Sequence, residues 1–338
     1  MQNIDFRSDT VTQPTRGMLE AMMQAATGDD VIDIDPTVRE LENRLAKHFG
    51  FDRGLFCPSG TMANQIAMMH HLRQGDEVIC EARSHIYWYE GGGVAANAGA
   101  SIRLVHGENG CLTVEDLQHA INPKNEHAAF SKLLSLENTG NKAGGTCYPI
   151  ADLQALSAFA RERGLAVHMD GARMFNALIA TGQSAHQHHG LYDSLSICLS
   201  KGLGCPVGSL LLVNESDYDS VRRIRKRLGG GMRQAGYLAA AGLYALDFHV
   251  ERLANDHRRA TDLAEGFIDI PWIQKVILPQ TNIVIFYTDR DPSEVIRVLA
   301  EKGIRLMEMG GGALRMVTHL QITDEHVQTT LQIMRELE

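Results

Sequence analysis

The sequence contains few cysteines, and none of them stands in a metal-binding spacing. Six cysteines are scattered over 338 residues, and no two form the C-x-x-C pair that is typical of zinc sites. Several lie in apolar runs, as reduced core cysteines of cytosolic proteins do. His186, His188 and His189 resemble a metal cluster, but their polar segment predicts a solvated loop. We therefore expect no metal site and a cytoplasmic location.

Long hydrophobic runs and an excess of positive charge are also missing. The first residues, MQNIDFRSDTVTQP, are polar and lack the apolar core of a signal peptide, and no run is long enough to predict a membrane span. The formal net charge is −9, and only residues 222–227 form a short basic run. We therefore expect neither a membrane nor a nucleic-acid partner.

The first two thirds of the chain alternate between strand and helix patterns. Seven short apolar segments between residues 55 and 213 predict strands, and amphipathic segments lie between most of them. This alternation predicts an α/β fold with a mainly parallel, seven-stranded, doubly wound sheet and helices on both faces.

From about residue 216 the pattern changes. It predicts a helix at 218–228, one long helix from about 234 to 267, and then a tail of mixed strands and helices. We therefore expect a large domain, residues 1–245 with the N-terminal segment 1–30 included, and a small C-terminal α+β domain, residues 246–338.

A lysine leaves a strongly apolar strand. In DSLSICLSKGLGCPVG, residues 193–208, Lys201 stands between a predicted buried strand and a glycine-rich turn. Desolvation at the edge of a core leaves an amine available as a nucleophile, which is what a Schiff-base lysine needs. The alternative interpretation is a solvated surface lysine.

A candidate anion site lies at Pro58-Ser59-Gly60-Thr61. A strand, a glycine-bearing turn and a helix start present free backbone N–H groups and the positive end of the helix dipole. Ser59 and Thr61 add hydroxyl groups. The stretch matches neither a Walker loop nor a G-x-G-x-x-G fingerprint, and the alternative is an ordinary helix start that binds only its own cap.

A carboxylate ends another apolar strand. In AVHMDGAR, residues 166–173, Asp170 stands at the strand end, and ligands of open α/β sheets bind at the carboxyl ends of strands. A cation there, such as a protonated ring nitrogen, would stabilise this carboxylate. Arg173 suits bidentate binding of a substrate carboxylate, and the alternative is a local Asp170–Arg173 ion pair.

Three further candidates are a histidine and two arginines. His85 follows a strand beside aromatic residues 87–89, and it suits stacking on an aromatic cofactor or service as a base. Arg233 follows three glycines and suits a phosphate. Arg315 lies inside an apolar strand, where a buried guanidinium needs an anion. The alternatives are a capping histidine, a flexible turn and a solvent-facing strand.

Together these residues supply what pyridoxal phosphate needs to act on an amino acid. Asp170 would keep the pyridine nitrogen protonated, so that the ring serves as an electron sink, and Lys201 would hold the aldehyde as an imine. The helix start would bind the phosphate, and the arginines would bind carboxylates.

A series of motifs in chain order resembles a known family. They are RSDTVT at 7–12, SGT at 59–61, SLENT at 135–139, DGAR and FNA within 170–177, CLSKGLG at 198–204, PVGSLL at 206–211, GGGMRQ at 229–234 and RMVTHL at 315–320. They resemble the L-threonine aldolases of the fold-type I pyridoxal-phosphate enzymes, most closely the bacterial low-specificity and L-allo-threonine types.

The resemblance implies a role for each matching residue. Lys201 looks like the lysine that binds the cofactor, Asp170 like the partner of its ring nitrogen, and His85 like the histidine that stacks on the ring. The implied catalytic set is Lys201, Asp170 and two candidate bases, His85 and His127. The implied cofactor-binding set is Ser59, Gly60, Thr61, His85, Asp170, Arg173, Lys201 and, from a neighbouring subunit, Arg233. The implied substrate-binding set is Ser8, His85, His127, Arg173 and Arg315.

The implied reaction is reversible retro-aldol cleavage of L-threonine, L-allo-threonine and related β-hydroxy-α-amino acids to glycine and an aldehyde. A homotetramer with active sites at a dimer interface and a place in glycine biosynthesis are implied as well. Two loops depart from the family pattern, at residues 33–35 and at Gly140, where a histidine is common. The alternatives are another pyridoxal-phosphate lyase or aminotransferase, and a non-catalytic cofactor-binding protein.

Overall fold

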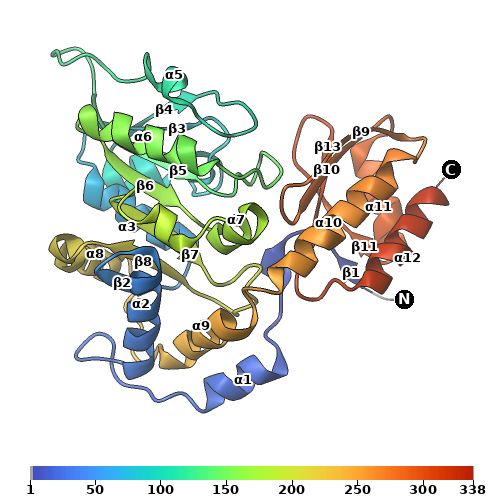
Figure 1. Ribbon diagram of the computed structural model, residues 1–338, viewed down its shortest axis with the longest axis horizontal. Helices are drawn as coiled ribbons and strands as arrows, with labels where there is room; N and C mark the ends of the chain where they lie inside the picture. The colour runs from blue at the N-terminus through green and yellow to red at the C-terminus, as the bar shows by residue number, and fades with distance from the viewer. Residues whose placement is uncertain (1–2, 338) are drawn as a thin grey trace.

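The structure, a computed structural model, describes residues 3–337 and contains two main sheets (Figure 1). The larger sheet has seven strands in the order β2-β8-β7-β6-β5-β3-β4. Their bounds are Arg53–Cys57 (β2), Asp76–Glu81 (β3), Ser101–Val105 (β4), Phe130–Glu137 (β5), Ala166–Asp170 (β6), Ser194–Cys198 (β7) and Ser209–Val213 (β8). The prediction of a seven-stranded sheet is confirmed.

The parallel character of this sheet is broken only at β8. Strands β4, β3, β5, β6 and β7 pair in parallel, whereas β8 is antiparallel to both β7 and β2. The connection from β7 to β8 is short, and a short connection can only join antiparallel neighbours. Two glycines in it, Gly204 and Gly208, have φ of 78° and 116°, which other residues rarely adopt.

Helices cover both faces of the large sheet, as predicted. Successive strand residues point to opposite faces, so Phe56 joins one core cluster while Leu55 and Cys57 join the other. The first face carries α2 (Pro36–Phe49), α5 (Val114–Leu117), α6 (Ile150–Glu162), α7 (Met174–Thr181) and α9 (Gly236–Phe248). The second face carries α3 (Gly60–His71), α4 (His85–Trp88), the π-helical turn η2 (Val94–Ala98) and α8 (Glu215–Arg227).

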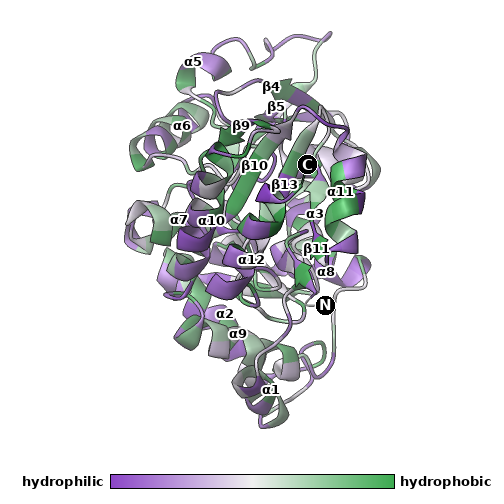
Figure 2. Cartoon of the chain, turned by 90° about the vertical axis from the view of Figure 1, so that its right-hand side faces the viewer, coloured by the Kyte–Doolittle hydropathy of each residue, from purple (hydrophilic) through white to green (hydrophobic). Residues whose placement is uncertain are grey.

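The C-terminal part is built on a four-stranded antiparallel sheet in the order β12-β13-β10-β9. The strands are β9 (Ile273–Ile277), β10 (Ile283–Thr288), β12 (Met307–Glu308) and β13 (Ala313–Val317), and the helices are α10 (Leu253–Ile268), α11 (Pro292–Glu301) and α12 (Asp324–Arg335). Figure 2 shows apolar strands behind the hydrophilic outer surfaces of α10 and α12. The other face of this sheet turns toward the large sheet.

The single long helix predicted over 234–267 is instead two helices. Helix α9 ends at Phe248 and α10 begins at Leu253. Side chains hold the intervening turn, because His249 Nδ1 hydrogen-bonds to the carbonyl of Leu203 at 2.7 Å and Arg252 donates to that of Gly202 at 3.3 Å. The break therefore lies beside the turn that carries Lys201, and the predicted domain boundary at 245/246 falls near the end of α9.

The N-terminal segment joins the two parts. Strand β1 (Ile4–Asp5) pairs in parallel with β11 (Ile304–Arg305) of the C-terminal part, followed by the 3-10 turn η1 (Asp9–Val11) and α1 (Arg16–Met23). Helix α1 packs against α9 of the large part. Residues 4–23 thus cross from one part to the other, past the carboxyl edge of the large sheet.

Candidate active site

Three charged side chains meet at the carboxyl ends of neighbouring strands. Glu137 ends β5 and lies directly opposite Asp170, which ends β6. Lys201 follows the next strand, β7, by three residues. Parallel strands bring these ends to one edge, which is where open α/β sheets bind their ligands.

Asp170 is a buried, charged acceptor. Its carboxylate accepts hydrogen bonds from Asn64 Nδ2 at 2.8 Å and from the Ala172 backbone N–H at 3.1 Å. Burial by itself raises the pKa of this carboxyl, but the charges of His85 and Lys201 outweigh burial, and the pKa lies below its usual value. Asp170 is therefore prepared to stabilise a cation in front of the sheet edge.

His85 begins α4 and is oriented by two carboxylates. Its Nδ1 lies 2.9 Å from Glu90 Oε1, and its backbone N–H donates to Glu137 Oε2 at 2.6 Å. Burial lowers the pKa of the imidazole, but the hydrogen bond to Glu90 and the charge of Asp170 raise it above its ordinary value. Because Glu90 occupies Nδ1, Nε2 is the nitrogen free to exchange a proton.

His85, Glu90 and Asp170 form a compact acid–base cluster. One nitrogen or oxygen of each lies within 4.8 Å of the others. Asn64 Nδ2 holds the cluster together, because it donates to Glu90 and to Asp170 at 2.8 Å each. The Asn64 amide is itself fixed, since its oxygen accepts from Ser196 Oγ at 2.7 Å.

Glu137 is the unusual carboxyl of the site. Burial and the neighbouring Asp170 raise its pKa to about 7, although N–H groups of Asn141 and His85 donate to it. The Asn141 bond is 2.8 Å long. Glu137 thus ties the loop after β5 to the start of α4, and it changes charge near neutral pH.

The N-terminus of α3 forms the candidate phosphate site. Ser59 caps the helix by accepting the Met62 N–H, and the helix start presents backbone donors and the positive end of the dipole. A Cβ on Gly60 would lie 2.4 Å from Cys198 Sγ. Only glycine allows α3 to approach β7 this closely, while the Thr61 side chain is exposed.

Arg173 is buried and paired with the N-terminal segment, rather than with Asp170. Its Nε and Nη2 donate to the two carboxylate oxygens of Asp9 at 2.7 and 2.8 Å. Asn282 of the C-terminal part also donates to Asp9 at 3.2 Å. Burial raises the pKa of Asp9, but the Arg173 charge brings it well below its usual range. Two of the guanidinium nitrogens of Arg173 are thereby committed to Asp9, and the third, Nη1, lies 3.4 Å from Asn141 Oδ1.

Arg315 lies on β13 and faces the large part. It is 6% exposed, its Nη2 donates to the Arg7 carbonyl at 2.9 Å, and its Nη1 donates to Asn141 Oδ1 at 3.0 Å. Its Nε has no hydrogen-bond partner, and within residues 3–337 no carboxylate lies at ion-pair distance from it. Burial, then repulsion from Arg173, lowers the pKa of Arg315 to about 10.

The N-terminal segment borders the same space. Ser8 caps η1 by accepting the Thr10 N–H at 3.2 Å. Thr12 Oγ1 donates to the carbonyl of Lys201 at 3.1 Å, which supports the lysine turn from the side. The segment thus brings Ser8 and Asp9 near the arginines and holds the backbone of Lys201.

Two predicted residues are not part of this arrangement within one chain. The side chain of His127 is 85% exposed and lies 3.8 Å from Glu126, in the loop before β5. That loop is at the opposite end of the strand, and an eight-residue strand is about 25 Å long. Arg233 is half-exposed and pairs with Asp29 at 2.9 Å.

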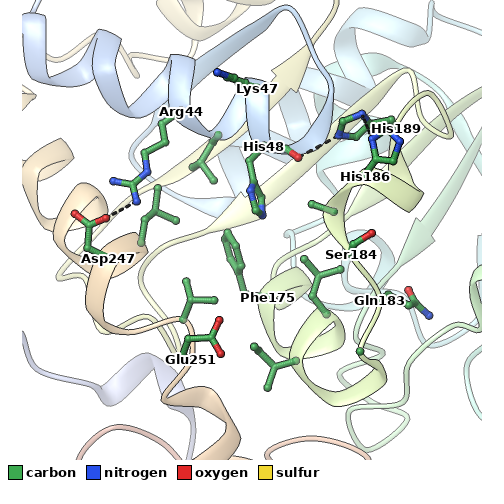
Figure 3. Close-up of a pocket in the computed structure, with 17 residues that line it drawn as sticks. Arg44, Lys47, His48, Phe175, Gln183, Ser184, His186, His189, Asp247 and Glu251 are labelled. Atoms are coloured by element: carbon green, nitrogen blue, oxygen red, sulfur yellow. Dashed lines mark hydrogen bonds and ion pairs between the residues drawn. The ribbon is translucent and has the colours of Figure 1, made fainter.

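A separate pocket of about 840 Å³ lies between α2, α7 and α9 (Figure 3). Its floor is apolar around Phe175, and its rim carries the Arg44–Asp247 ion pair. None of the predicted site residues lines it. At the same rim His186 is exposed and His189 is half-buried, but His188 is 1% exposed and bonded to Tyr192, so the prediction of a solvated loop was wrong for His188.

Comparisons with known proteins place the chain in a family. The β-eliminating lyase family model matches residues 5–291. The low-specificity L-threonine aldolase 1 of Arabidopsis thaliana is 39% identical over 345 residues, which cover 99% of this chain and 96% of the relative. The chain belongs to the β-eliminating lyase family. Low specificity L-threonine aldolase of Escherichia coli O157:H7 is 42% identical, with 96% of each chain covered.

Solved structures of the same family share the fold. A threonine aldolase of Leishmania major has a TM-score of 0.83 at 21% identity, with 99% of each chain covered. These findings confirm the predicted family, the fold-type I architecture, the enzyme class and the cofactor, pyridoxal phosphate.

The residues present fit the cofactor of this lyase family. The α3 N-terminus and the close approach at Gly60 suit a phosphate, and the buried Asp170 suits a protonated ring nitrogen. Lys201 lies near enough to Asp170 for its charge to lower the pKa of that carboxyl. Among residues 3–337, no helix is both long and apolar enough to cross a membrane.

Sequence reasoning missed several residues of the site. They are Asp9, Asn64, Glu90, Glu137 and Asn141. Asp9 and Glu137 stood inside the recognised motifs RSDTVT and SLENT, so the motifs could have drawn attention to them. Asn64 and Glu90 lie in ordinary helical or turn sequence, and no local signal could have found them.

Proposed function

We propose that this chain cleaves L-threonine, L-allo-threonine and related β-hydroxy-α-amino acids to glycine and an aldehyde. The observation that carries the proposal is one sheet edge with a charged, buried Asp170 beside Lys201 and His85. The names of the relatives support the same reaction, since those at 39% and 42% identity are low-specificity L-threonine aldolases.

The cofactor-binding residues have separate roles in attaching the cofactor and in stabilising its charged groups. Pyridoxal phosphate, when bound, supplies an aldehyde for the Lys201 amine and a ring that accepts electrons from the breaking bond. Asp170 retains its negative charge and holds a proton on the ring nitrogen, because its pKa is lowered. Ser59, Gly60 and Thr61 receive the phosphate at the α3 N-terminus.

His85 is the base that this chain itself supplies. Glu90 fixes the ring and leaves Nε2 free, and the raised pKa of the imidazole makes Nε2 a stronger acceptor for the β-hydroxyl proton. Loss of that proton drives cleavage of the Cα–Cβ bond. His127 acts as a second base only if a neighbouring subunit brings it to this site.

Arg315 is the principal carboxylate ligand, with Arg173 Nη1 and Ser8 at its side. Arg315 is the buried cation of the site without a carboxylate partner among the described residues, and a buried guanidinium gains most from a charged acceptor. Fixing the carboxylate selects which substituent of the α-carbon lies across the ring, and therefore which bond breaks.

Assembly, location and domain division complete the proposal. A homotetramer in the cytoplasm, with active sites at a dimer interface, would explain why Arg233 is exposed in one chain. In glycine biosynthesis the cleavage direction would supply glycine. We propose the large domain as residues 1–245 and the small domain as 246–338.

Product analysis tests the function directly. The holoenzyme is given L-threonine, L-allo-threonine or phenylserine, and glycine, aldehyde and keto acid are measured. We expect glycine and aldehyde in equal amounts, and we expect Lys201→Ala to lose the visible absorbance of bound cofactor and about 10³-fold or more of the activity. Keto acid as the product would favour an aminotransferase. A cofactor-loaded protein inert on all three substrates would favour a non-catalytic binding protein.

A further inference from the structure

The two arginines of the carboxylate site converge on a single neutral oxygen. Asn141 Oδ1 accepts from Arg315 Nη1 at 3.0 Å and lies 3.4 Å from Arg173 Nη1. One arginine comes from β13 of the C-terminal part, and the other precedes α7 of the large part. An amide oxygen between two guanidinium groups stands where a carboxylate oxygen would be expected.

The other contacts of the two arginines show which of them lacks an anionic partner. Asp9 neutralises Arg173 through two hydrogen bonds of 2.7 and 2.8 Å. Among the described residues, Arg315 has only neutral acceptors, namely the Arg7 carbonyl, Asn141 Oδ1 and, at 3.8 Å, Met307 Sδ, and its buried Nε has none. Burial of a cation without an anion costs free energy, and a neutral amide oxygen offsets less of that cost than a carboxylate does.

Hydrogen bonds hold the backbone of Asn141 and of the loop that follows it. Its backbone N–H donates to Glu137 at 2.8 Å, and the loop that follows packs on the inward face of the C-terminal sheet, with Thr281 Oγ1 donating to the Gly145 carbonyl at 2.8 Å. The backbone is thereby held at both ends while the side chain is half-buried. The side chain can rotate away without displacement of the loop.

We propose that Asn141 is an internal substitute for the substrate carboxylate. It holds Arg315 and Arg173 together until an amino acid binds, and then it leaves. The proposal rests on the proposed function of these arginines as the carboxylate clamp. It makes Asn141 a positioning residue that competes with the substrate, rather than a ligand of it.

Three variants of the holoenzyme test this role. Asn141→Ala removes the competing oxygen, so the KM for L-threonine should fall about threefold or more, and the melting temperature without amino acid should fall as well. Asn141→Asp places a carboxylate permanently between the arginines, so KM should rise about tenfold or more and the melting temperature should rise. Lys142→Ala, in the same loop but stacked on Trp88 at 4.2 Å, controls for disturbance of the loop and should change neither quantity.

The same variants separate failure of this inference from failure of the proposed function. Glycine binding needs no cleavage, and it can be measured as the shift that glycine produces in the melting temperature. This shift should be larger in Asn141→Ala and smaller in Asn141→Asp than in the wild type. A higher KM and a smaller glycine shift in Asn141→Ala would make Asn141 a substrate ligand and overturn the inference. Absence of cleavage in the wild type, with the glycine shifts as expected, would overturn only the proposed function.

Discussion

At the scale of single residues, the site stabilises buried carboxylates with neighbouring cations and with amide or N–H donors. Asp170 relies on the charges of His85 and Lys201 and on hydrogen bonds from Asn64 and a backbone N–H. Asp9 relies on Arg173 and Asn282. Each carboxylate therefore keeps its charge in spite of burial. Glu137 differs, since burial and Asp170 outweigh its two donors and its pKa rises to about 7.

This raised pKa predicts a pH-dependent stability that one substitution should remove. Glu137 has a pKa raised from 4.5 to about 7, so its contribution is complete below pH 4.5 and is lost as the pH rises through about 7. Glu137→Gln cannot ionise, so the unfolding free energy of the variant should rise by about 3 kcal/mol relative to the wild type between pH 4.5 and 8. Denaturant unfolding of both proteins at several pH values measures the difference.

A matched control separates this effect from the loss of hydrogen bonds. The glutamine amide opposes one of the N–H donors, but that cost is the same at every pH. Glu162→Gln, at the exposed end of α6, should give a curve parallel to the wild type. Parallel curves for Glu137→Gln as well would show that Glu137 is ionised throughout this range.

What the sequence could reveal at this scale depended on local context. Lys201 and Asp170 stand at the ends of apolar strands, where position alone indicates a ligand site. The partner of Arg173 could not be predicted, because Asp9 is 164 residues away and Asp170 is the nearer acid in the chain. The contact between Asn141 and Arg315 could not be predicted either, because only the fold brings β13 beside Asn141.

At the scale of elements, the approach of α3 to β7 sets the candidate phosphate site. The added Cβ of Gly60→Ala would lie 2.4 Å from Cys198 Sγ, so α3 must shift or the sulfur must move. Overpacking of this kind costs about 1–3 kcal/mol. We expect cofactor affinity to fall about tenfold, as measured by titration of the visible absorbance of bound cofactor.

Removal of the sulfur should restore binding. The double variant Gly60→Ala/Cys198→Ala opens the space that the new methyl group needs, so its affinity should return to within about threefold of the wild type. Cys198→Ala alone serves as the control and should bind cofactor nearly normally. Equal impairment of the single Gly60 variant and the double variant would mean that the clash with sulfur is not the cause.

The seven-stranded, mainly parallel sheet and the helices on both of its faces were predictable from pattern, but the break between α9 and α10 was not. No proline or glycine lies between Phe248 and Leu253, so the sequence carries no helix-breaking signal there. The turn depends on His249 and Arg252, which bond to carbonyls of residues 203 and 202. Tertiary contacts of this kind override local helix propensity.

At the scale of the whole molecule, the exposed candidate site residue Arg233 suggests a contact with another subunit. Arg233 is half-exposed and its ion pair with Asp29 joins two surface groups, which contributes little to stability. The sequence could indicate its role only through resemblance, since no pattern within one chain specifies a contact with another. The proposed shared site therefore needs a test that distinguishes subunits.

Mixed oligomers provide that test. Lys201→Ala subunits lack the attachment point, and Arg233→Ala subunits lack the proposed phosphate contact, so each variant alone should lose most of its activity. If a site combines Lys201 of one subunit with Arg233 of another, random assembly of the two variants makes a quarter of all sites intact. Co-expression in equal amounts should therefore restore about 25% of wild-type activity, measured as glycine formed per subunit. Activity no higher than the average of the two parent variants would place Lys201 and Arg233 of each site on the same chain, or remove Arg233 from the site altogether.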